Sequence, residues 1–357
     1  AIIMSTTLES TESTVAPTRP WKKTPTQLMP TVVILMLAAV LDVSVVAVTP
    51  MKGKLAYALL FFLFSVGMQF IYAWVNRGRP AAMDSLAGAV TMTGGLIVFL
   101  PVLSILVTVI VKGLPGLGLH TFTQTMEKTS YGDPLSSGGL LHAIIGTVYL
   151  IVIATAISLP LSILTALYLT EIKGRAAGFI QFLVQAMSGV PSVVAGVFIY
   201  AAILLTTNLR GSTFIGALPL AILMIPTVTR TAQEVLLLVP ADLREAGLAL
   251  GATQWRTVAT IVVPAARSGL ITAVILGVAR IAGETAPLLF TLGTTDKVNL
   301  NPFTGGQNAL PYYIWSGLRD GTDGGIARAW TAILVLLILV LSLFTTARIF
   351  GDRKAKR

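Results

Sequence analysis

Long apolar segments are the feature that most constrains how this chain can fold. Each is long enough to cross a hydrocarbon layer of about 30 Å as a helix. Hydrophobic residues make up 55% of the 357 residues and charged residues only 11%, whereas ordinary soluble domains carry about 25% charged residues. We therefore predict an all-α, polytopic membrane protein with eight transmembrane helices. The predicted spans are 30–49, 55–75, 86–111, 140–170, 176–207, 214–232, 267–292 and 326–348.

The N-terminal part of the chain has two features of its own. Residues 1–28 are rich in Ser, Thr and Pro and have no apolar period, which predicts a disordered tail in the cytoplasm. Residues Pro50–Lys54 form a predicted turn between the first two spans, so residues 29–75 are expected to make a transmembrane hairpin. Pro160 and Pro191 lie inside later spans, where they are expected to kink the helices.

The formal net charge of +10 is explained by topology. With the N-terminus inside, about sixteen Lys and Arg residues fall in the tail and the cytoplasmic loops, against about seven outside, which is a clear positive-inside bias. The bias places both termini and the loop 233–266 in the cytoplasm, and it removes the reason to expect a nucleic-acid partner. The chain has no cysteine and no Walker A motif, so we expect no cofactor in it; ATP and Mg²⁺, if used, would bind a partner chain.

The loop 233–266 carries the signals of a short helix. Asp242 and Glu245 have the spacing of a capping box, and Pro240 lies just upstream, where a helix can begin. Leu243, Gly247 and Leu250 fall on one predicted face, and the next residue, Gly251, provides a left-handed stop. We predict a helix of one to two turns with a surface of small residues.

The same loop resembles a family signature. ABC importer permeases carry a cytoplasmic EAA-x3-G-x9-I-x-L-P loop, and Glu245-Ala246-Gly247, Gly251, Ile261 and Val263-Pro264 match it in register. Gly247 stands in place of the second Ala and Val263 in place of Leu; both changes keep the size or the aliphatic character. In that family the loop is a coupling helix that docks on the ATP-hydrolysing subunit. The resemblance thus implies coupling roles for a set of six residues: Asp242, Arg244, Glu245, Ala246, Gly247 and Gly251.

The resemblance also has implications for domains. The family core is a type I permease of six transmembrane helices, so the hairpin 29–75 is an addition in front of a permease domain at 76–357, with its core at 140–348. The segment Ala279–Thr291, ARIAGETAPLLFT, resembles the phosphate-specific branch of the family, the PstA type.

Charged residues inside the spans are the candidates for function. Arg280 and Glu284 lie four apart in the predicted seventh span and are expected on one face. A central charge costs about 2.5–3.5 kcal/mol on insertion scales, so such a pair either sets helix packing or lines an anion pathway. Arg230 ends the sixth span, where an Arg is either topological or part of the path. The phosphate branch has an Arg before the coupling loop and an Arg-x3-Glu after it, so the resemblance implies that Arg230, Arg280 and Glu284 line the translocation path.

The remaining polar residues and prolines lead to separate expectations. Asp42 is expected to be structural, and His120 and His142 have no metal-ligand spacing, so no metal site is predicted. The residues Pro311–Trp315 predict a short amphipathic helix at the outer surface, where it lies in the membrane interface or docks a partner. Pro287 is expected to break the seventh helix just after Glu284.

The resemblance implies a function and a set of partners. The chain would be the permease subunit of an ATP-driven phosphate importer in the cytoplasmic membrane, with a homologous second permease subunit, two ATP-binding subunits and an extracytoplasmic phosphate-binding protein. A permease for molybdate or sulfate, and a transporter driven by an ion gradient, are the alternatives. No spaced set of His, Cys, Ser or carboxylates indicates catalysis, so we do not expect an enzyme.

Overall fold

The computed structural model describes residues 25–49 and 53–353, and in this part of the chain all regular secondary structure is helical, with no strand. The described residues fall into two compact units, divided between Ser104 and Ile105. The long helices are α1 (Pro25–Val48), α2 (Lys54–Arg77), α3 (Arg79–Gly113), α5 (Leu141–Leu167), α8 (Thr213–Leu237), α12 (Arg267–Ala282) and α15 (Asp323–Arg353). The shorter ones are η1 (Leu114–Gly116), α4 (Leu119–Thr123), η2 (Tyr168–Ile172), α6 (Ala177–Ser188), α7 (Ser192–Ile199), η3 (Tyr200–Leu204), α9 (Ala241–Ala249), α10 (Gln254–Thr257), η4 (Val258–Val262), α11 (Val263–Ala265), α13 (Leu288–Thr291) and α14 (Leu310–Asp320).

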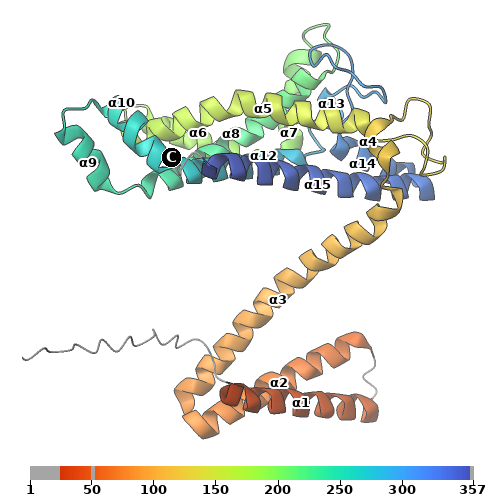
Figure 1. Cartoon of the computed structure of the whole chain (residues 1–357), viewed down its shortest axis with the longest axis vertical. Coiled ribbons are helices and arrows are strands. Elements are labelled where there is room, and N and C mark those ends of the chain that lie inside the picture. The colour runs from red at the N-terminus through yellow and green to blue at the C-terminus, as the bar shows by residue number, and fades with distance from the viewer. Residues whose placement is uncertain (1–24, 50–52, 354–357) are drawn as a thin grey trace, which may run out of the picture. The chain divides into compact units, whose positions relative to one another are not determined.

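In the first unit, α1 and α2 form the predicted hairpin (Figure 1). The buried residues of α1 recur at every fourth position, so they lie on a single face of the helix. They are Ile34, Ala38, Asp42 and Val46. Three of the turn residues, 50–52, lie outside the described residues, as does most of the predicted tail; residues 25–28 are the first turn of α1. The predicted domain boundary at residue 75 stays a prediction.

In the second unit, α5, α8 and α12 pack around one apolar core. Small residues let the helices approach closely: a Cβ on Gly277 of α12 would overlap the side chain of Val228 in α8. Hydrogen bonds also join α5 to α8 within this core, among them one from Ser162 Oγ to the carbonyl of Ile225 at 3.2 Å and one from Thr229 Oγ1 to the carbonyl of Ser162 at 3.4 Å. The result is a tightly packed helix group on which α12 is held in a fixed position.

The predicted spans are largely confirmed, with two corrections. Six helices of the described residues are long and apolar enough to cross a membrane, or up to eight if each of two bent pairs is one span. Residues 176–207 are not one straight helix, because α6 and α7–η3 are bent by 102° across a break at Pro191. The seventh span is not continuous over 267–292, because α12 ends at Ala282 with Gly283 as its C-cap. Pro160, in contrast, lies inside an unbroken α5.

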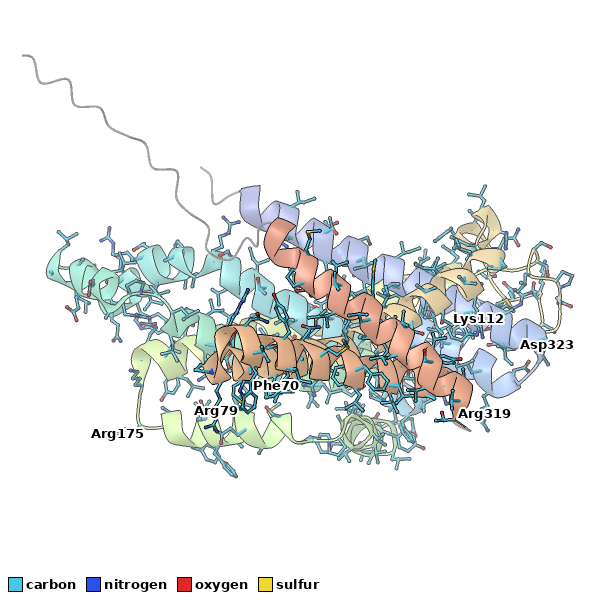
Figure 2. The ribbon with its side chains drawn as sticks, turned by 90° about the horizontal axis from the view of Figure 1, so that it is seen from below. Phe70, Arg79, Lys112, Arg175, Arg319 and Asp323 are labelled. Atoms are coloured by element: carbon cyan, nitrogen blue, oxygen red, sulfur yellow. The ribbon has the colours of Figure 1, made fainter. Side chains whose placement is uncertain are left out.

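The two ends of the second unit carry different elements (Figure 1). Helices α9 and α10 lie at one end, and α4, α13 and α14 lie at the other; we call these the α9 end and the α14 end. The positive-inside pattern assigns Arg175 to one side of the membrane and Lys112 and Arg319 to the other. Figure 2 shows Arg175 at one end of the unit, and Lys112 and Arg319 at the opposite end.

The α14 end is held together by buried polar contacts. Arg328 of α15 is 6% exposed and donates hydrogen bonds to the carbonyls of Ser137 at 2.9 Å and Pro134 at 2.8 Å. The predicted helix at Pro311–Trp315 is confirmed as α14. Its Tyr313 is 1% exposed and burial raises the pKa of the phenol, so this face of α14 is part of the core rather than of the surface.

We expect Gly277→Ala to lower the melting temperature of the purified full-length permease complex. The added Cβ would overlap Val228, which is fully buried, and overpacking of this kind costs about 1–3 kcal/mol. Thermal unfolding followed by intrinsic fluorescence measures the change. Gly178→Ala in α6 is the control, because a Cβ there meets nothing within 4 Å. An unchanged melting temperature for Gly277→Ala would contradict the close packing of α8 and α12.

Candidate functional site

The predicted short helix in the loop after α8 exists as α9. Its first residue follows Pro240, whose φ of −56° and ψ of 140° turn the chain into the helix, and the segment ends at Gly251 with φ +80°. The predicted stop at Gly251 is therefore confirmed. The predicted capping box is wrong: Pro240 occupies the N-cap position and no side chain caps the helix. Asp242 instead lies in the first turn, where a negative charge is favoured by the helix dipole.

Gly247 is one of the residues through which α9 packs against the rest of the chain. It is buried, and a Cβ built on it would lie 2.8 Å from both Thr257 Cγ2 and Ile261 Cδ1. Real Cβ atoms do not approach other atoms this closely, so the packing of α9 on α10 and η4 explains why glycine stands here. Leu250 lies beyond the last residue of α9, so the predicted stripe of Leu243, Gly247 and Leu250 ends at Gly247.

The other side of α9 is open. Leu243, Leu248 and Leu250 are 42%, 49% and 88% exposed, and Asp242, Glu245 and Ala246 are exposed with them. Large apolar side chains gathered on one short helix, with carboxylates between them, form a surface suited to a protein partner. We call these six residues, five in α9 and Leu250 directly after it, the open face of α9.

Arg244 ties α9 to two other helices. Its Nε and Nη2 donate to both carboxylate oxygens of Glu171 in η2, at 2.8–3.2 Å. Nη1 donates to the carbonyl of Val239 at 2.6 Å, and Nη2 also donates to that of Leu236 at 2.8 Å. The Glu171 side chain is 6% exposed and that of Arg244 24%. The hydrogen bonds that Arg244 donates to the Glu171 carboxylate raise the pKa of Arg244 above its usual value.

The structure brings two of the three predicted path residues onto one surface. Arg280 near the end of α12 donates from Nη1 to Thr227 Oγ1 of α8 at 2.8 Å. Arg230 is three residues after Thr227 in the same helix and therefore on the same face. Both arginines are exposed, although they belong to apolar helices that are otherwise packed against one another.

Glu284 does not lie where the spacing predicted. Because α12 ends at Ala282, Glu284 belongs to the non-helical segment Gly283–Pro287, and the helical i, i+4 relation to Arg280 is lost. The ion pairs among the described residues do not include one between Arg280 and Glu284. The expected break of the helix occurs before Glu284 rather than after it, since Gly283 rather than Pro287 terminates α12.

Three polar residues near this surface were missed. Glu234 is exposed and lies one turn beyond Arg230 in α8, which continues past the predicted end at 232 to Leu237. Gln233 Nε2 donates to Gln181 Oε1 of α6 at 3.0 Å. The signal for Glu234 was its spacing of four from Arg230, whereas nothing in the sequence connects Gln181 with Gln233. Together they extend the polar surface towards the α9 end.

A cavity lies at the α14 end beside the break in α12. It has a volume of about 490 Å³ and is lined by residues of η3, the loop after it, and α13, with Arg210 as its charged residue. Gly196 of α7 packs on the other side of the break, so closely that a Cβ would lie 2.5 Å from Pro287 Cα. Within the described residues, no group of three His, Cys, Asp or Glu side chains is placed to hold a metal ion.

Apolar helices of membrane-spanning length, arginines on a helix face and a short helix with an open apolar face define the class: a multi-pass membrane protein that works with partner subunits. The model of the family described as "Binding-protein-dependent transport system inner membrane component" matches residues 158–356. The chain belongs to this family.

Relatives resemble the chain over most of its length. The phosphate transport system permease protein PstA of Pasteurella multocida is 40% identical over 255 residues, which is 71% of this chain and 88% of the relative. PstA 1 of Mycobacterium tuberculosis H37Rv is 34% identical over 271 residues, 74% of this chain and 86% of the relative. Among solved structures, the inward-facing MetNI methionine ABC transporter has 20% identity and a TM-score of 0.44, with 61% of this chain and 93% of that chain covered.

We expect Gly247→Val to detach α9 from η4, because the larger side chain has no room beside Thr257 and Ile261. The measurement is the rate of tryptic cleavage after the exposed Arg256, followed by mass spectrometry in the full-length protein; we expect an increase of several-fold. Ala246→Val is the control, since it introduces the same residue at an exposed position of the same helix. Equal cleavage rates in the two variants would contradict the packing role of Gly247.

Proposed function

We propose that this chain is the transmembrane subunit of an ATP-driven importer of inorganic phosphate. The observation that carries the proposal is the placement of Arg280 and Arg230 on one face, with Thr227 holding Arg280. The names of relatives at 34–40% identity, phosphate transport system permease proteins, support it.

The two arginines suit an oxyanion. An Arg presents a rigid fork of N–H donors that matches phosphate oxygens in pairs. The bond to Thr227 uses one donor nitrogen of Arg280, which orients the guanidinium and leaves its remaining donors for a ligand. A charge on a membrane-spanning helix has to face protein or a water-filled path rather than lipid. We infer that a homologous second permease subunit covers this face and that phosphate passes between the two subunits.

Glu284 has a changed place in this proposal. It is half-buried in the segment between α12 and α13, so we assign it to the lining of the path near the break in the helix. It does not hold Arg280 as an ion-pair partner in this conformation.

The open face of α9 is the proposed docking site for an ATP-hydrolysing subunit. Its exposed leucines and carboxylates have no partner within the described chain that covers them. Asp242, Glu245 and Ala246 would contact the partner, while Arg244, Gly247 and Gly251 shape the helix. ATP and Mg²⁺ would bind two such partner subunits. The α9 end would then face the cytoplasm with both termini, and the α14 end would receive an extracytoplasmic phosphate-binding protein.

A central test is the reconstituted complex with its ATPase subunits, in which phosphate-dependent ATP hydrolysis and phosphate uptake are measured. We expect Glu245→Lys to dissociate or uncouple the ATPase, because it reverses a charge on the open face of α9. We expect Arg280→Gln to keep assembly and to lower uptake at least 100-fold. Arg175→Gln, an exposed charge outside the proposed machinery, is the control.

The same assay separates the alternatives. Inhibition of phosphate uptake by an equal concentration of molybdate or sulfate would indicate that the substrate is a different oxyanion. Uptake that persists without the ATPase subunits and collapses with an uncoupler would establish a gradient-driven transporter. If Arg280→Gln instead prevents assembly, its role is in helix packing and the path assignment is wrong.

We expect Thr227→Val to lower phosphate uptake by up to about tenfold, because the variant keeps the side-chain shape and removes the hydrogen bond to a charged group. Uptake rates across phosphate concentrations measure the effect. Thr272→Val on the exposed side of α12, whose hydroxyl bonds only within its own helix, is the matched control. Equal loss in both variants would contradict the orienting role of Thr227.

A further inference from the structure

The contact between Arg244 and Glu171 joins three parts of the chain. Residue 244 belongs to α9 and residue 171 to η2, the π-helical turn at the end of α5. Arg244 also donates to the carbonyl of Leu236, in the last turn of α8, and to that of Val239, in the connection between α8 and α9. Gln254, the first residue of α10, adds a hydrogen bond from its side chain to the carbonyl of Glu171. One side chain therefore contacts the end of α8 and η2, the turn that continues α5.

The geometry is more demanding than that of a surface ion pair. All three nitrogens of the guanidinium are used, and they reach four different oxygens. Besides the two oxygens of the Glu171 carboxylate, the guanidinium donates to the carbonyls of Leu236 and Val239, so it contacts both the last turn of α8 and the connection that follows it. A lysine ammonium offers its donors from a single point and does not match this planar arrangement.

The covalent connection does not make this contact redundant. From α8 to α9 the chain runs only through Leu238, Val239 and Pro240, and rotation about these few residues would let α9 move while α8 stays in place. From α9 to α5 the connection is non-covalent, and the Glu171 carboxylate is its charged part. The contact restricts hinge motion of α9 relative to α8. It also connects α9 to α5, so that a movement of α9 displaces the end of α5 as well.

We propose that Arg244 and Glu171 form a rigid link that makes α9 move as one body with the ends of α5 and α8. The inference rests on the proposed function, because it describes how a push on the open face of α9 reaches the face that carries Thr227 and Arg230. Arg244 and Glu171 are positioning residues and touch neither phosphate nor nucleotide. Loss of the link lets α9 yield to the ATPase subunit without displacing α8, so ATP is hydrolysed with less transport.

The test compares Arg244→Gln, Glu171→Gln, the double variant and Arg244→Lys in the full complex with its ATPase subunits. Three quantities are measured: co-purification of the ATPase subunits, the ATPase rate, and phosphate imported per ATP hydrolysed. We expect assembly and hydrolysis to be retained and phosphate imported per ATP to fall by about tenfold in each single variant. The double variant should be no worse than the more affected single one, and Arg244→Lys should restore the ratio only in part. Arg175→Gln, an exposed charge in the loop next to η2, is the control and should keep the wild-type ratio.

The outcomes are distinct. Normal phosphate per ATP in both single variants, or losses that multiply in the double variant, would overturn the link. Loss of co-purified ATPase subunits in both single variants, with an unchanged ratio in the complexes that remain, would assign the contact to assembly and also overturn it. A wild-type complex without phosphate-dependent hydrolysis and uptake would show that the proposed function itself is wrong.

Discussion

The membrane imposes the constraint on which the rest of this structure depends: an irregular backbone at membrane depth has to be buried in protein or line a water-filled cavity. The chain breaks two of its apolar segments, before Ser192 and after Ala282. The second break is covered by the first bent pair, since Gly196 of α7 lies directly against Pro287. Pro287 and Leu288 are buried as a result. The bend in α6–α7 and the end of α12 therefore support each other, and the place of Arg280, just before the break, follows from this packing.

Close packing of helices also determines what Arg280 meets. Gly277 allows α12 to approach Val228 of α8 within the space of a missing Cβ, and Arg280 comes three residues later on the same side. At this spacing the guanidinium reaches Thr227, while Thr229 turns to α5. The hydroxyls of α8 thus have different roles on different faces. Gly277 in the core and Arg280 at the edge of the core together produce the surface on which we propose that phosphate binds.

Features that depend on neighbouring residues were predictable from the sequence, and those that depend on distant pairing were not. The apolar spans, the short helix α9, its stop at Gly251 and the helix at Pro311–Trp315 follow from local patterns. The end of α12 is not predictable in this way, because Gly283 lies inside a long apolar run and nothing in its neighbours marks it as the C-cap. The predicted capping box does not form because Pro240 occupies the N-cap position of α9. Thr227 lies 53 residues from Arg280 and Glu171 lies 73 from Arg244, and no spacing rule connects residues at such separations.

The two sides of α9 show how a short helix can transmit force between subunits. A helix of nine residues is marginal on its own, so it can carry a load only if its own chain holds it. Gly247 holds it against η4, and Arg244 holds it to α5 and α8. Both contacts use the inner side and leave Leu243, Leu248 and Glu245 free for a partner. Gly247, which replaces the second alanine of the family's loop signature, lies on the inner side of α9. There it allows α9 to pack more closely on η4, and the open face of α9 stays unchanged.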